Sequence, residues 1–175
     1  SMCCAPDVAV ITNVSPNHLD KHPSYQDYID AKSSIFSNQS PDSRLVLNAA
    51  DGHTEYYAEK APSKVVYFSR GAAVENGVYS QNGVIYSARK GRSAKIMDAS
   101  GMLLPGDHNL ENYMAAFAAL DGLVTPEICR SVAGSFAGVE HRLEFVRELR
   151  GVKYINDSIG TSPTRTAAGL HAMKV

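Results

Sequence analysis

Four side chains that bind metals or exchange protons follow the first apolar run of the chain, namely Asn13, Asn17, His18 and Asp20. They come directly after Val8–Ile11, whose lack of alternation predicts a strand buried on both faces, as in a parallel sheet. In open α/β sheets, ligands bind beyond the carboxyl ends of the strands. The segment is therefore a candidate ligand site, although His18 taken alone also fits an ordinary loop histidine.

Lys32 stands on the apolar face of the next predicted helix. That helix is expected to span Ser24–Asn38, with Ser24 as N-cap and Asp27 completing a capping box. Its apolar face is formed by Tyr25, Tyr28, Ile29 and Phe36. An ammonium group on a buried face is costly unless it is paired, deprotonated or chemically modified. The simpler alternative is that the stem of Lys32 packs on this face while its head reaches water.

Composition limits the classes of protein to consider. The 175 residues suffice for one domain or a little more, and 44% hydrophobic residues support a sizeable core. A net charge of -1 argues against a non-specific nucleic-acid binder. We expect no membrane association, because no apolar run is long enough to span a bilayer. Three cysteines without zinc or disulfide spacing favour a reducing compartment, so we predict a cytoplasmic protein.

Strand and helix patterns alternate after the first helix. Apolar runs at Arg44–Asn48 and Val65–Phe68 predict two strands, with a helix at His53–Lys60 between them. Such alternation implies right-handed crossovers and a parallel sheet. The Asn82-Gly83 dipeptide between two short apolar runs then predicts an antiparallel hairpin. The expected fold is therefore three-layer α/β, with a mainly parallel sheet and a small antiparallel hairpin excursion.

Two asparagines open the longest predicted helix, which we expect at Asn109–Leu123. Asn109 and Asn112 are three residues apart, so both amides lie on one helix face. An amide carries a donor and an acceptor together, which can match the edge of adenine. Capping of the helix is the simpler alternative for these residues.

The last part of the chain reads as a hinge followed by a strand and a polar loop. Gly138–Arg142 predicts the hinge, an exposed strand is expected at Leu143–Leu149, and a further strand at Val152–Ile155. In the hinge, the guanidinium fork of Arg142 suits a phosphate or ribose, whereas pairing with Glu140 or Glu144 is the alternative. A final helix is predicted at Thr164–Met173.

Taken together and in this order, these segments resemble the Mur ligases, ATP-dependent amide ligases of peptidoglycan precursor synthesis. The segments are Asn13–Lys32, Gly106–Asn112, Gly138–Arg142 and Tyr154–Arg165. The resemblance implies that His18 holds Mg²⁺ and that Lys32 is carbamylated and positions a second magnesium ion. Carbamylation turns the amine into a carboxylate-like anion, which suits a hard cation.

The same resemblance assigns a nucleotide site to the later segments. It implies that Asn109 and Asn112 contact the adenine of ATP and that His141 and Arg142 reach the nucleotide. Two further roles follow for the polar loop, with Asp157 on the ribose hydroxyls and Thr161 facing the phosphates. The chain departs from the family at Ile159, where many members carry a lysine that helps with phosphate, so that role is lost here.

The asparagine-aspartate-serine element at Asn156–Ser158 is most similar to members that add D-glutamate. The resemblance then implies transfer of D-glutamate onto UDP-N-acetylmuramoyl-L-alanine through an acyl phosphate. Alternatives are another Mur ligase, folylpolyglutamate synthase, or a non-catalytic nucleotide-binding module of the same fold. The glycine- and lysine-containing phosphate loop of the family has no match in this sequence.

The missing loop leads to three expectations about organisation. Residues 1–139 are expected to be the second half of the central ATP-binding domain, and residues 140–175 the hinge and the start of the carboxy-terminal acceptor-binding domain. As a fragment without the phosphate loop, the chain alone is predicted to be inactive. Strand edges that the intact domain pairs are also expected to drive self-association.

Overall fold

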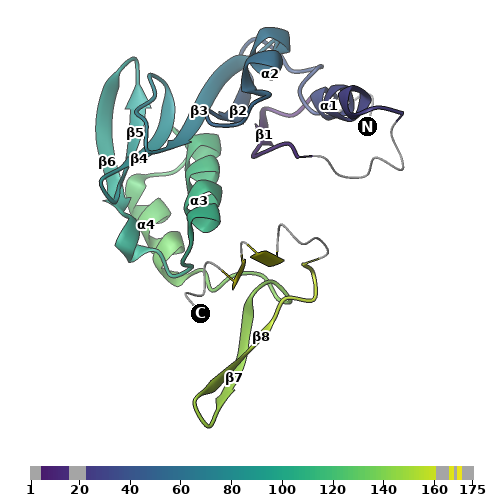
Figure 1. The fold of residues 1–175 in the computed structure, drawn as a ribbon. Coiled ribbons are helices and arrows are strands. Elements are labelled where there is room, and N and C mark those ends of the chain that lie inside the picture. Colours follow the sequence, from purple (N-terminus) through teal and green to yellow (C-terminus); the bar gives the residue numbers. More distant parts are fainter. Residues whose placement is uncertain (1–4, 16–22, 161–165, 168, 171–175) are drawn as a thin grey trace.

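A six-stranded sheet forms the centre of the protein (Figure 1). The computed structural model describes residues 5–15, 23–160, 166–167 and 169–170. Strands β1 to β4 are parallel, while β5 and β6 continue the sheet in antiparallel fashion, in the order β1-β2-β3-β4-β5-β6. The strands are β1 (Val8–Ile11), β2 (Arg44–Asn48), β3 (Lys64–Arg70), β4 (Gly77–Gln81), β5 (Val84–Arg89) and β6 (Arg92–Asp98). The predicted mainly parallel sheet with an antiparallel excursion is confirmed.

Helices cover both faces of this sheet and create two cores. On one face, α1 (Tyr25–Ser33) and α2 (Thr54–Lys60) pack with Leu45 and Leu47 of β2. On the other, α3 (Asp107–Leu120) and α4 (Pro126–Ser135) pack with Val46. Alternate residues of β2 therefore enter different cores, which is why its three central residues, Leu45–Leu47, are all apolar. The three-layer arrangement agrees with the prediction.

Strand β1 contributes to both cores but lies at the edge of the sheet. Ala9 and Ile11 are buried on the α1 and α2 side, and Val8 and Val10 pack against the opposite cluster. Its only strand partner in the described part of the chain is β2. The apolar run thus predicted two-sided packing correctly, and among the described residues β1 is the edge strand of the sheet.

The local signals for α1 and for the hairpin are confirmed. The Ser24 hydroxyl oxygen accepts the Asp27 backbone N–H at 3.1 Å and donates to the Asp27 carboxylate at 2.7 Å. The helix ends at Ser33, earlier than expected, and turns continue the chain to Asn38. Asn82 and Gly83 have φ of 52° and 75°, the left-handed pair that a tight hairpin between β4 and β5 requires.

A second, two-stranded sheet follows the hinge. Strands β7 (Glu144–Leu149) and β8 (Val152–Asn156) pair antiparallel and project away from the main sheet (Figure 1). Of the predicted helix at Thr164–Met173, residues 166–167 and 169–170 are described and helical. The domain boundary after residue 139 remains a prediction. No helix within the described ranges is long and apolar enough to cross a bilayer.

Candidate nucleotide site

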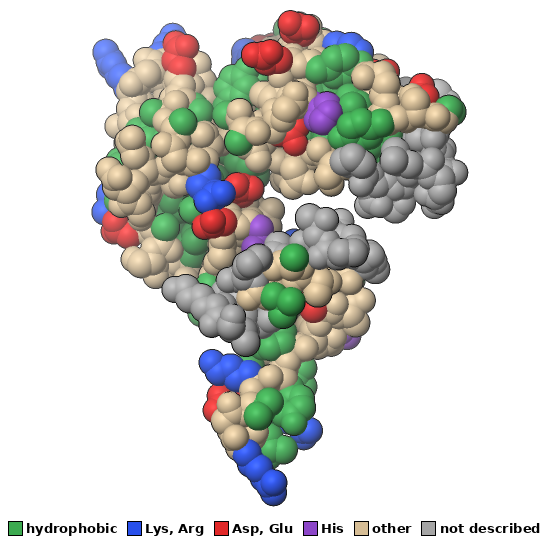
Figure 2. Space-filling view, in the orientation of Figure 1, with side chains coloured by type: hydrophobic (Ala, Val, Ile, Leu, Met, Phe, Trp, Pro, Cys, Tyr) green, Lys and Arg blue, Asp and Glu red, His purple; other side chains and the backbone are tan. Residues whose placement is uncertain are grey.

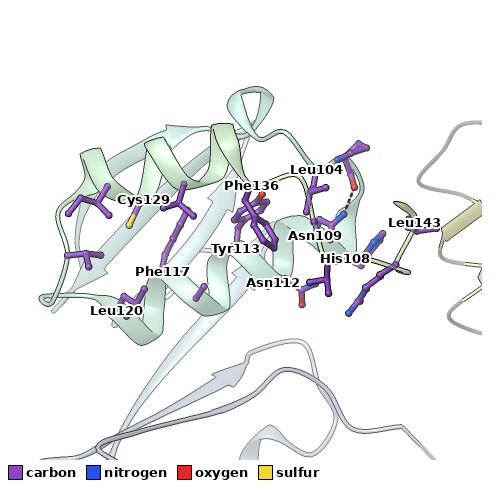
Figure 3. A pocket seen from close by; sticks show the side chains of 18 of the residues that line it. Leu104, His108, Asn109, Asn112, Tyr113, Phe117, Leu120, Cys129, Phe136 and Leu143 are labelled. Carbon is purple, nitrogen blue, oxygen red and sulfur yellow. Dashed lines mark hydrogen bonds between the residues drawn. The ribbon is translucent and has the colours of Figure 1, made fainter. Parts of the chain in front are cut away.

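A cavity of about 540 Å³ lies between α3, α4 and the hinge (Figure 3). Most of its wall is apolar, with side chains from both helices such as Phe117, Cys129 and Phe136. Its polar lining gathers at the amino-terminal end of α3, where His108, Asn109 and Asn112 stand near the hinge. This combination of a flat apolar wall with a few polar groups is typical of a small-molecule site.

The start of α3 fixes the two asparagines. Gly106 adopts φ of 100°, and its carbonyl accepts the N–H groups of Asn109 and Leu110, both at 3.1 Å. The Asn109 amide nitrogen donates to the Pro105 carbonyl at 2.7 Å, and the residue lines the cavity (Figure 3). Asn112 lies one turn later, exposed and also on the cavity wall. The two asparagine amides thus share a helix face as expected, and Asn109 also stabilises the Pro105–Gly106 segment before α3 through its bond to Pro105.

His108 is a cavity residue to which the sequence argument assigned no role. Its pKa is lowered, first by burial of the imidazole and second by the positive charge of Arg142. Both effects disfavour the charged ring, so His108 is neutral at pH 7 and carries one donor and one acceptor nitrogen. The sequence feature that could have identified His108 as a site residue is its position beside Asn109 in the Gly106–Asn112 element.

The hinge places only part of its predicted residues in the cavity. Arg142 and Leu143 line it, whereas His141 does not. The His141 side chain is 59% exposed and its Nδ1 lies 2.9 Å from the side-chain nitrogen of Asn156. Asp157, which follows β8, binds the backbone just after the hinge, because its Oδ1 accepts the Leu143 N–H at 3.2 Å. Asn109, Asn112 and Arg142 therefore share one cavity, whereas His141 lies in the adjoining hinge and Asp157 directly after β8.

The predicted magnesium site is described only in part. His18 and Thr161 lie outside the described residues. Lys32 is half-buried, and its Nζ stands 4.7 Å from the centroid of the Tyr28 ring. No cluster of three or more potential metal-binding His, Cys, Asp or Glu side chains occurs among the residues that are described. The metal roles of His18 and Lys32 therefore stay predictions.

The Asp51 carboxylate forms hydrogen bonds that link the segments following β1 and β2. Its Oδ2 accepts the Val14 N–H at 2.8 Å, just after β1, and its Oδ1 accepts the His53 N–H at 2.9 Å. The His53 ring in turn packs edge-on against Tyr25 of α1, with centroids 5.6 Å apart. The carboxylate of Asp51 therefore links the segment after β1 to the β2–α2 turn. The His53 ring extends this link to Tyr25 at the start of α1.

Figure 2 shows how the surface is divided between charged and apolar side chains. Charged groups are scattered over the face in view, and apolar side chains are prominent on the projecting hairpin. On that hairpin the exposed apolar residues are Phe145, Val146, Leu149, Val152 and Tyr154.

Comparison with known proteins extends the geometric picture. Residues 1–120 match the Mur ligase middle domain. A UDP-N-acetylmuramoylalanine--D-glutamate ligase from Acetivibrio thermocellus is 47% identical over 99% of this chain, and one from Ruminiclostridium cellulolyticum is 50% identical over 97%. The chain spans only 37% and 36% of the lengths of these two relatives.

Solved structures share the fold at lower sequence identity. A crystal structure of MurF from Acinetobacter baumannii has a TM-score of 0.77 and 22% identity over 97% of this chain, which corresponds to 37% of the MurF chain. MurF from Thermotoga maritima, solved in complex with ADP, has a TM-score of 0.69 and 20% identity, covering 97% of this chain and 39% of that one. On the evidence of the matched domain and the relatives together, the chain belongs to the Mur ligase family.

Proposed function

We propose that this chain is the adenine-binding part of an ATP-dependent ligase that adds D-glutamate to UDP-N-acetylmuramoyl-L-alanine. The specificity rests on relatives of that name, at up to 50% identity across nearly the whole chain. The observation that carries nucleotide binding is the cavity in which Asn109, Asn112 and Arg142 meet. A cytoplasmic location and the absence of nucleic-acid partners remain predictions.

The cavity offers what an adenine ring needs. Apolar side chains such as Leu104 and Phe136 provide surfaces for the flat base, and the asparagine amides provide donors and acceptors for its edge. The neutral ring of His108 adds one further donor and one acceptor. Arg142 is exposed at the mouth and suits the negative charge that follows the base.

The reacting end of the proposed enzyme draws on groups beyond this cavity. When bound, ATP would supply the phosphoryl group that activates the substrate carboxylate. We propose that Asp157 holds the ribose hydroxyls, that Thr161 faces the phosphates, and that His18 and carbamylated Lys32 hold Mg²⁺. In the intact enzyme, Lys32→Ala is expected to lose most activity without rescue by bicarbonate, and full activity of that variant would contradict the assignment.

Titration of the isolated chain with ADP tests the adenine site. We expect weak, saturable binding with amide shifts at Asn109 and Asn112, because the base contacts lie in this chain. Asn112→Asp removes the amide donor and is expected to weaken binding, whereas Asn82→Asp, on the distant β4–β5 turn, is the charge-matched control. Equal affinity of both variants, or no binding by the wild type, would overturn the proposed site.

Phosphate release tests the separate prediction that the chain alone is not a catalyst. Purified chain with ATP, magnesium and both substrates is expected to remain at background, because the phosphate loop is absent from its sequence. Loss of oriented donors around a transferring phosphoryl group reduces rates by orders of magnitude. Turnover that disappears in His18→Ala would show that this sequence suffices for catalysis.

A further inference from the structure

Asn156, the last residue of strand β8, is held by two partners of opposite hydrogen-bonding character. Its Oδ1 accepts the Ser158 backbone N–H at 3.2 Å, and its Nδ2 donates to Glu144 Oε2 at 3.2 Å. A backbone N–H only donates and a carboxylate only accepts. Rotating the amide by half a turn would therefore set a donor against a donor and an acceptor against an acceptor.

This fixed amide determines the tautomer of His141. Asn156 Nδ2 lies 2.9 Å from His141 Nδ1, and an amide nitrogen donates but does not accept. His141 Nδ1 must then be the acceptor, so the proton of the neutral ring is on Nε2. A ring protonated at Nδ1 would lose its bond to Asn156 and would meet Glu144 Oε2 only at 3.8 Å.

The backbone holds the ring in place as well. Glu144 Oε2 accepts the His141 N–H at 2.8 Å, and the His141 carbonyl accepts the Ile159 N–H at 3.2 Å. These bonds support a φ of 65° at His141, in the left-handed region that non-glycine residues seldom adopt. Glu144 thus fixes the backbone of His141 and the orientation of Asn156 with the same oxygen.

We propose that Asn156 and Glu144 are positioning residues that keep His141 as an Nε2–H donor, so that His141 binds only an acceptor atom of its ligand. The identity of that ligand rests on the proposed function, in which it is a ring nitrogen or ribose oxygen of the nucleotide. Asn156 thereby acts on nucleotide recognition through His141, without a contact of its own.

Nitrogen-15 NMR of the histidine-labelled chain at about pH 8.5, where an ordinary imidazole is neutral, reads the tautomer directly. His141→Gln identifies the two ring resonances. We expect an unprotonated Nδ1 and a protonated Nε2 in the absence of any ligand. Because this is also the form that a free imidazole favours in water, the decisive comparison is between variants.

The double variant Glu144→Gln with Asn156→Asp exchanges the acid and amide while leaving net charge unchanged. The carboxylate at position 156 then requires a proton on His141 Nδ1. The glutamine at position 144 keeps an acceptor oxygen for the His141 N–H and avoids a second carboxylate beside position 156. We expect the ratio of Nδ1-protonated to unprotonated ring to rise about tenfold or more, as one net hydrogen bond dictates. Glu144→Gln alone is the matched control, since Ser158 still orients Asn156.

An Nδ1 protonated in the wild type, or unprotonated in a folded double variant, would overturn the tautomer assignment. Circular dichroism checks the fold of each variant. Addition of ADP to a uniformly nitrogen-15-labelled sample tests the ligand. The His141 Nε2 resonance is expected to shift together with the Asn112 amide. A shift at Asn112 without one at His141 would overturn the donor role of His141, whereas a failure of ADP to bind at all would overturn the proposed function.

Discussion

Replacement of Asp51 by asparagine is the sharpest test of how the carboxyl end of the sheet is held together. The two carboxylate oxygens accept the N–H groups of Val14 and His53 at 2.8 and 2.9 Å, and the side chain is only 12% exposed. Asparagine has the same shape but only one oxygen. Its NH₂ group must therefore face one of the two N–H donors.

The size of the effect follows from the bonds that are lost. Removing the acceptor of a buried N–H group leaves that donor unsatisfied, which costs about 1–3 kcal/mol. Asp51→Asn is thus expected to lower the free energy of unfolding by about 2 kcal/mol. With a urea dependence of about 2 kcal/mol/M, the unfolding midpoint falls by roughly 1 M.

Urea denaturation followed by circular dichroism measures this loss. Asp42→Asn is the matched control, because Asp42 is 96% exposed and pairs with the exposed Lys64. We expect its midpoint to equal that of the wild type, as for most surface ion pairs. Equal midpoints for Asp51→Asn and Asp42→Asn would refute the argument that Asp51 fastens β1 to the β2–α2 turn.

Three further outcomes are expected. Gly77→Ala should destabilise the fold by about 3 kcal/mol or more, because φ is 132° and the added Cβ would collide with the Tyr67 carbonyl. Gly83→Ala, with open space around it, should lose only about 1 kcal/mol in the same denaturation assay. Because the folded pKa of His108 is lowered, the unfolded state binds more protons, so stability should fall as pH drops through about 6.5 and below. A pH series should show a smaller fall for His108→Gln. Light scattering over a concentration series should reveal self-association through the open edge of β1, and a monomer throughout would contradict it.

Local sequence chemistry was sufficient to predict most elements of the main sheet. The strand predicted at Arg44–Asn48 matches β2 residue for residue, because its central residues Leu45–Leu47 are apolar on both faces, as in a strand buried on both sides. Asn82-Gly83 located the hairpin, since both residues readily adopt the left-handed conformation. Ser24 with Asp27 located the start of α1 through a bond that spans three residues.

The meeting of Asn109, Asn112 and Arg142 in one cavity depended on tertiary packing. Their types and the family resemblance named them, but the space they share exists only because α4 and the hinge pack beside α3. The same is true of His108, whose lowered pKa arises from burial and from a charge 34 positions away in the chain. Spacing along one helix shows which side chains share a face, and it does not show what that face will meet.

The tautomer of His141 depends even more on the folded structure. The family resemblance of Gly138–Arg142 implied that His141 reaches the nucleotide, and nothing in that segment indicated Asn156 as its partner. The pairing of β7 with β8 brings Glu144 opposite Asn156, and the left-handed backbone at His141 turns the ring toward both. The sequence by itself therefore determined the family, the sheet and the candidate residues. Only the tertiary structure decided which of them share the cavity and which nitrogen carries the proton, because both depend on groups that meet across strands and helices.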